Sequence, residues 1–139
     1  MIGKLNHVGI ATPSIEESWK LYREVMGVQD ITEKRAFPEQ GVWVSFVNLP
    51  NAQIELIEPL GEASPIHAFL ARNPRGGQHH VCFEVESILS ARDEMRAKGA
   101  TVLGTGEPRI GAHGVPVIFV HPKDMGGVLV ELMETPSPH

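Results

Sequence analysis

Cysteine is nearly absent from the chain, because its 139 residues include only Cys82. A single cysteine cannot close an intramolecular disulfide, and the neighbours of Cys82 (HVCF, residues 80–83) favour a buried thiol over a nucleophile. Long apolar runs are missing too, since none approaches the roughly 20 residues of a membrane-spanning helix. Residues 1–4 (MIGK) lack the apolar segment of a signal peptide. These absences predict a cytoplasmic protein with no membrane partner.

Positive charge is scarce as well. Twelve Lys and Arg residues stand against 17 Asp and Glu residues, which gives a net charge of -5. Nucleic acids and anionic membranes reward a basic face, so the charge excludes both as expected partners. Apolar residues make up 42% of the chain and charged residues 21%, which is globular composition. The length allows one domain, or two small similar halves that share a core.

Histidine, in contrast, is abundant: the chain has seven. Two of them lie in segments that repeat, NHVGIA at residues 6–11 and HHVCFE at residues 79–84, which both predict short buried strands. An offset of 73 residues superposes the segments and aligns His7 with His80. Successive strand residues face opposite sides, so of His79 and His80 at most one is a candidate ligand, and the repeat selects His80.

A capped helix follows each of these strands. The same offset carries Ser14 onto Ser87, and each serine is placed to cap a helix. Ser14 and Glu17 predict a capping box, in which the hydroxyl accepts the Glu17 amide and the carboxylate reaches back to the cap amide. The second helix is predicted over about residues 88–98, with a stop at Gly99. The first is predicted to end at Gly27 and to carry an apolar stripe of Ile15, Trp19, Tyr22, Val25 and Met26.

The two halves also end alike, with AQIELIEP at residues 52–59 and VLVELME at residues 128–134, now at an offset of 76. Further strands are predicted over residues 42–47 and 116–120. The pattern of strand, helix and about three strands occurs twice and predicts an α+β fold. We expect two βαβββ modules related by a pseudo-twofold, forming a curved mixed sheet around a metal site. The predicted domain covers residues 1–139, with modules at about 4–60 and 77–134 and a short linker helix that starts at Ser64-Pro65.

Each half places one histidine and one glutamate in apolar strands: His7 with Glu55, and His80 with Glu131. A glutamate buried between apolar residues needs a partner. Taken alone, a histidine at a strand start is usually a hydrogen-bonded structural residue, and a strand glutamate usually faces solvent. The recurrence of the pair at matching positions favours one shared divalent metal instead. Two nitrogens and two carboxylate oxygens suit Zn, Co, Ni, Mn or Fe without choosing among them.

The paired modules resemble the vicinal oxygen chelate (glyoxalase/bleomycin resistance/dioxygenase) superfamily, and the local motifs resemble its methylmalonyl-CoA epimerases over nearly the whole chain. His…Glu spacing alone indicates only the superfamily, whereas IGAHG and HPKD point to the epimerases. The motifs are NHVGIA (6–11), PEQGV (38–42), IELIEPL (54–60), GQHHV (77–81), RIGAHG (109–114), HPKD (121–124) and GGVLVEL (126–132).

The resemblance implies metal ligands at His7, Glu55, His80 and Glu131, for a divalent ion such as Co, Zn, Ni or Mn. It implies an isomerase that interconverts the (2R) and (2S) forms of methylmalonyl-CoA by proton removal and return at C2 through a metal-stabilised enolate. An acyl-CoA substrate and a homodimer are implied as well.

The chain departs from part of that family. Some epimerases carry a catalytic glutamate two or three residues after PEQGV and a glutamine at the second ligand position. This chain has Trp43 and Val44 after that motif, and Glu55 at the ligand position. Our hypothesis is that Glu55 and Glu131 act as the two opposed acid/base groups.

Other polar residues carry weaker predictions. Glu39, beside Pro38, fits a polar turn residue better than a site residue. His113 in its glycine-flanked loop fits a spacer and the substrate mouth equally well. Arg109 and Lys123 could meet CoA phosphates, although surface cations are usually only solvated. The residues expected to be structural are His67, His121 and His139.

Two alternative functions use the same fold. A glyoxalase I-like lactoylglutathione lyase would use the same four ligands. A metal-free small-molecule binding protein would not need all four ligand types, so their retention argues against it. Ring-cleaving dioxygenases of the superfamily usually bind iron through two histidines and one glutamate, which disfavours that chemistry.

Overall fold

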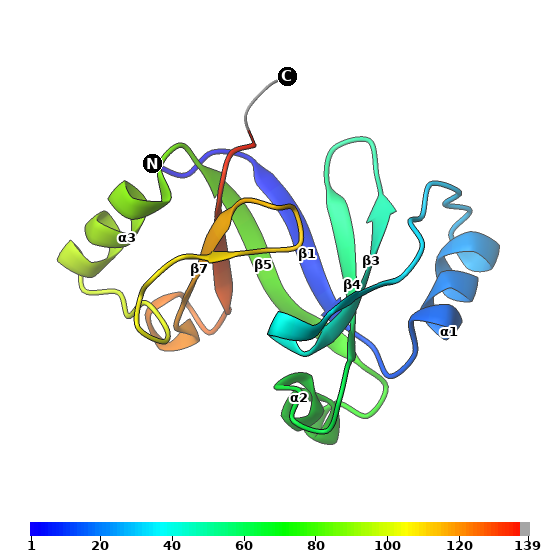
Figure 1. The fold of residues 1–139 in the computed structure, drawn as a ribbon. Coiled ribbons are helices and arrows are strands. Elements are labelled where there is room, and N and C mark those ends of the chain that lie inside the picture. The colour runs from blue at the N-terminus through cyan, green and yellow to red at the C-terminus, as the bar shows by residue number, and fades with distance from the viewer. Residues whose placement is uncertain (137–139) are drawn as a thin grey trace. The chain divides into compact units, whose positions relative to one another are not determined.

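The computed structural model describes residues 1–136 and leaves residues 137–139, among them His139, outside the described part (Figure 1). The chain divides into two compact units. The first unit is His7–His79, and the second unit joins Met1–Asn6 to the residues from His80 onward. Within residues 1–136 no helix is long and apolar enough to cross a membrane.

The strands of the first unit form a mixed sheet. From His7 onward β1 (Leu5–Ala11) runs parallel to β4 (Gln53–Pro59). Strand β4 pairs antiparallel with β3 (Val42–Asn48), and β3 pairs antiparallel with the short β2 (Arg35–Phe37). The helical elements of this unit are α1 (Ile15–Lys20), the π-helical turn η1 (Leu21–Val25), the 3-10 turn η2 (Pro38–Gln40) and α2 (Ile66–Arg72).

The second unit repeats this pairing. The part of β5 (Gly77–Val85) that follows His80 pairs in parallel with β8 (Val130–Glu134). Strand β8 in turn pairs antiparallel with β7 (Pro116–Val120). Strand β7 pairs antiparallel with the two-residue strand β6 (Arg109–Ile110). Helix α3 (Ile88–Ala97) and the 3-10 turn η3 (Pro122–Asp124) complete it. The order strand, helix, three strands thus occurs twice, which confirms the predicted α+β class. That both halves build one domain with the predicted module bounds stays a prediction.

Strand alternation separates two faces in each unit. In β4, Leu56 joins a core with Ile15 and Tyr22, whereas Glu55 faces the other way. In β8, Leu132 joins the α3 core, whereas Glu131 and Met133 face the other side. The helix therefore covers one face, and each candidate glutamate lies on the opposite face.

The first helix differs from its prediction. Ser14 Oγ accepts the Glu17 amide at 3.2 Å as expected. The Ser14 amide, however, donates to Thr12 Oγ1, and the Glu17 carboxylate pairs with Lys20, so the second half of the capping box is wrong. Gly27, with φ of 72°, lies after the helix as predicted.

The apolar stripe is also shorter than predicted. The regular helix ends at Lys20, and the Met26 amide then bonds five residues back to the Leu21 carbonyl. This wider turn changes the helical period, and Val25 and Met26 lie exposed at 76% and 60%.

A second glutamate in each half caps a helix. Glu58 Oε1 accepts the Ile15 amide at 2.8 Å, and Glu134 Oε1 accepts the Ile88 amide at 3.1 Å. A carboxylate at a helix N-terminus satisfies a free amide and complements the helix dipole. The strands that carry Glu55 and Glu131 thus also hold the helices on the opposite face.

We expect Glu134→Ala to lower the free energy of unfolding by about 1 kcal/mol, because the Ile88 amide loses its acceptor. Glu134→Gln should lose less, since the amide oxygen can still accept. Urea denaturation measures both, with Glu86→Ala, an exposed glutamate just before the same helix, as the control. Equal losses for Glu134→Ala and Glu86→Ala would contradict the capping role.

Candidate active site

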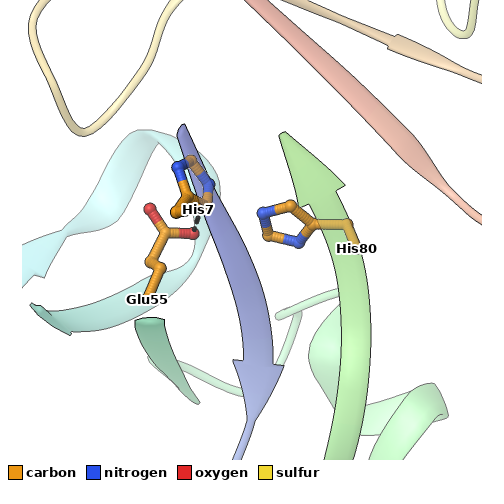
Figure 2. Close-up of side chains that lie close together, drawn as sticks. All are labelled: His7, Glu55 and His80. Atoms are coloured by element: carbon orange, nitrogen blue, oxygen red, sulfur yellow. Dashed lines mark ion pairs between the residues drawn. The ribbon is translucent and has the colours of Figure 1, made fainter. Parts of the chain in front are cut away.

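The first unit brings His7 and Glu55 together. His7 in β1 is 1% exposed and Glu55 in β4 is 7% exposed. His7 Nε2 and Glu55 Oε1 lie 3.8 Å apart, the ion pair drawn in Figure 2. Gly9 lies beside Glu55 in the parallel register, two residues after His7 on the same face. The sheet therefore places the imidazole and the carboxylate side by side.

The second unit brings His80 and Glu131 together in the same way. His80, which Figure 2 shows on β5, is 4% exposed, and Glu131 is 7% exposed. His80 Nε2 lies 3.2 Å from Glu131 Oε1. The ring of Phe119 meets the His80 ring edge-on, with centroids 5.8 Å apart. An apolar ring thus backs the imidazole.

The neighbours of the glutamates show how far the repeat extends. Phe46 is the register partner of Glu55, and Phe119 is the register partner of Glu131. The parallel partner differs, because Gly9 adjoins Glu55 and Cys82 adjoins Glu131. Cys82 is fully buried and packs with Val117 and Met133, so its thiol belongs to an apolar layer beside the second pair, as predicted.

His79 packs against helix α2, whereas His80 lies beside Glu131. Its ring lies edge-on to Phe69 of α2, with ring centroids 5.2 Å apart. His79 is half-buried whereas His80 is buried, which agrees with the predicted alternation between the two neighbours.

The donor chemistry of both pairs fits a divalent metal. Imidazole nitrogen and carboxylate oxygen are ligands of Zn²⁺ and related ions, and these residues offer such atoms. Two atoms that each lie about 2.1 Å from a shared ion are at most about 4.2 Å apart, and both measured separations, 3.8 Å and 3.2 Å, are shorter. Burial makes a lone carboxylate costly, so a cation beside each would also offset its desolvation.

The turn between β6 and β7 adds a residue that sequence reasoning missed. The Gly111 amide donates to the Val115 carbonyl at 3.0 Å, and the Gly114 amide donates to the Gly111 carbonyl at 2.9 Å. A methyl group added to Gly111 would meet Val117 Cγ1 at 2.9 Å and Glu131 Oε2 at 3.8 Å. The only sequence signal was the IGAHG motif, which does not tell a turn glycine from one against a carboxylate.

The weaker candidates lie in turns and on edges. Glu39 is exposed in η2, which ends at Gly41 with φ of 68°. His113 is half-buried in the β6–β7 turn, and Val44 is buried in β3. Arg109 and Lys123 are exposed.

Two histidines expected to be structural make local hydrogen bonds. His67 Nε2 lies 2.9 Å from the Gly61 carbonyl oxygen. His121 Nδ1 accepts the Lys123 amide at 3.0 Å. Both bonds are to backbone atoms of neighbouring residues, which is the usual setting of a structural histidine.

Comparison with known proteins decides the family. A family model described as the glyoxalase/bleomycin resistance protein/dioxygenase superfamily matches residues 6–119. The chain belongs to this superfamily. Its resemblance to the superfamily at the sequence level is thereby confirmed, and enzymes of the superfamily typically use a metal ion.

Within the superfamily, several of the similar proteins are epimerases. The chain is 56% identical over 132 residues to an ethylmalonyl-CoA/methylmalonyl-CoA epimerase of Cereibacter sphaeroides, covering 95% of this chain and 98% of that protein. It is 50% identical over 131 residues to the mitochondrial methylmalonyl-CoA epimerase of Homo sapiens, covering 94% and 73%. A solved methylmalonyl-CoA epimerase in complex with methylmalonyl-CoA and NH4+ matches with a TM-score of 0.89 at 30% identity, covering 99% of this chain and 97% of that one.

Proposed function

We propose that the chain is a methylmalonyl-CoA epimerase that inverts C2 of its acyl-CoA substrate. The observation that carries this proposal is the 56% identity, over nearly the full length, to an enzyme named for ethylmalonyl-CoA and methylmalonyl-CoA epimerisation. The two buried His–Glu pairs support it, because inversion by two groups uses one acid/base on each face of the carbon and a carboxylate can serve as that group.

The substrate chemistry explains the demand for two groups. C2 lies between a thioester and a carboxylate, so loss of its proton leaves an electron pair that delocalises onto the thioester oxygen. One glutamate removes the proton and becomes neutral. The other, protonated beforehand, returns a proton to the opposite face and becomes ionised. Exchange with solvent restores the starting protonation states, so the reaction balances without a further reactant.

Glu55 and Glu131 are the proposed acid/base groups. Each is at least nine-tenths buried, and each comes from the same position of its βαβββ repeat. Val44, where some epimerases carry a catalytic glutamate, is an apolar residue buried in β3 and cannot transfer a proton. In the first unit the proton-transfer role therefore goes to Glu55. The sheet holds its carboxylate beside His7, on the face opposite the helix.

The proposed metal ligands are His7, Glu55, His80 and Glu131. A divalent ion such as Co, Zn, Ni or Mn would supply electrophilic stabilisation of the negative charge that develops on the substrate oxygen. Two imidazoles and two carboxylates would hold it, and each glutamate would have a second oxygen for proton transfer. A cytoplasmic homodimer completes the proposal.

The decisive test is solvent exchange at C2. In D2O the protein should incorporate deuterium at C2 of methylmalonyl-CoA while it interconverts the two epimers, followed by NMR and mass spectrometry. Methylglyoxal with glutathione is the competing assay for a glyoxalase I-like lyase. No exchange with the CoA ester would overturn the proposed function, and turnover of the hemithioacetal would replace it.

Removal of either proposed acid/base should stop inversion. Glu55→Gln and Glu131→Gln should each lower the epimerisation rate by at least about 100-fold, because an amide cannot take up the proton. Glu58→Gln is the matched control, since Glu58 lies on the same strand as Glu55 but bonds to the Ile15 amide. Near-normal turnover by Glu55→Gln would contradict its assignment.

Metal content tests the ligand set separately. Protein purified without chelator should contain about one divalent ion per chain, measured by elemental analysis. His80→Ala should bind the ion at least about tenfold more weakly. His67→Ala, whose ring bonds the Gly61 carbonyl, should keep it. Equal metal content in His80→Ala and His67→Ala would contradict the proposed ligands.

A further inference from the structure

The two oxygens of the Glu131 carboxylate have different neighbours. Oε1 lies 3.2 Å from His80 Nε2. Oε2 lies toward the β6–β7 turn, 3.8 Å from the point that a side-chain carbon of residue 111 would occupy. One oxygen therefore faces the imidazole and the other faces the backbone of Gly111.

Gly111 lies there because it has no side chain. Its backbone is so close to Val117 that an added methyl group would stand 2.9 Å from Val117 Cγ1, which is closer than carbon atoms pack. Gly111 is buried, and its amide closes the turn onto Val115. The turn backbone thus lies beside the Glu131 carboxylate.

The turn between β2 and β3 of the first unit packs differently. Gly41 ends the turn between β2 and β3, and a methyl group there would meet Ser64 Cα at 3.3 Å and Pro65 Cδ at 3.4 Å. Those atoms belong to the segment before α2 and not to Glu55. In the β2–β3 turn Gly41 thus packs against the segment before α2, whereas in the β6–β7 turn Gly111 packs beside Glu131.

We propose that Gly111 is a positioning residue for proton transfer by Glu131. Its backbone keeps the carboxylate oriented, with Oε1 toward His80, so that Oε2 is the atom that removes and returns the C2 proton. This inference rests on the proposed epimerase function and on Glu131 as one of its two acid/base groups. Gly111 lies beside Glu131, so a change at Gly111 acts on the glutamate that is proposed to serve one face of C2.

The test variant is Gly111→Ala. Gly111 does not have a positive φ, so alanine fits its backbone conformation and acts through its methyl group alone. We expect kcat to fall about tenfold or more, because small displacements of a reacting group cost rate steeply. KM and metal content should change little.

Isotope effects provide the readout that a general structural defect would not reproduce. Thermodynamics fixes the ratio of kcat/KM in the two directions, so both must fall together. In the direction in which Glu131 removes the proton, the primary kinetic isotope effect on kcat/KM for substrate deuterated at C2 should rise. In the reverse direction, in which Glu131 delivers a solvent-derived proton, the solvent isotope effect should rise instead. Isotope effects that change alike for both epimers would overturn the proposal.

The double variant Gly111→Ala/Val117→Ala separates crowding from loss of stability. Removing the Val117 methyl groups relieves the 2.9 Å contact, so the turn can return and kcat should recover relative to Val117→Ala alone. If Gly111→Ala does not fold, the double variant still reports the isotope effects of a chain with a methyl group beside Oε2. A double variant that folds, has normal isotope effects and stays slow would overturn the proposal. Failure of the wild-type chain to exchange C2 would instead reject the epimerase function itself.

Discussion

The structure depends on the cost of burying carboxylates inside apolar sheets. Glu55 and Glu131 are each only 7% exposed, although an ionised carboxylate is strongly favoured in water. Each lies beside a histidine on the neighbouring parallel strand. Strand alternation allows this arrangement, because the apolar residues on either side of each glutamate enter the helix core while the glutamate faces away.

Much of this arrangement could be predicted from the sequence. Alternation within IEL and VEL, together with the recurrence of His and Glu at matched positions, indicated the buried pairs. The capping serines indicated where the two helices begin, and Gly99 indicated where the second helix ends. The rest depends on long-range contacts. Strands β2 and β6 are short, and their residues are mostly exposed, so they carry no periodic signal. The π-helical turn after Lys20 and the approach of Gly111 to Glu131 are set by tertiary packing, which local propensity does not encode.

The departures from the repeat are as informative as the repeat itself. Gly9 adjoins Glu55, whereas Cys82 adjoins Glu131 within an apolar layer that includes Met133. Gly111 lies against Glu131, whereas Gly41 packs against the segment before α2. The surroundings of Glu55 and Glu131 therefore differ, although the His–Glu pairs themselves repeat.

The start of the chain connects the two repeats in a way that the halves alone do not suggest. The Gly3 amide donates to the Glu84 carbonyl, and the Glu84 amide donates to the Lys4 carbonyl, both at 2.8 Å. Asn6 adds a side-chain bond to the Glu84 carboxylate at 3.0 Å. A fragment that begins at Gly77 would leave these backbone groups of β5 open, and open strand edges recruit other chains. The second repeat therefore does not satisfy its own first strand, because residues 3–6, which precede the first unit, complete it.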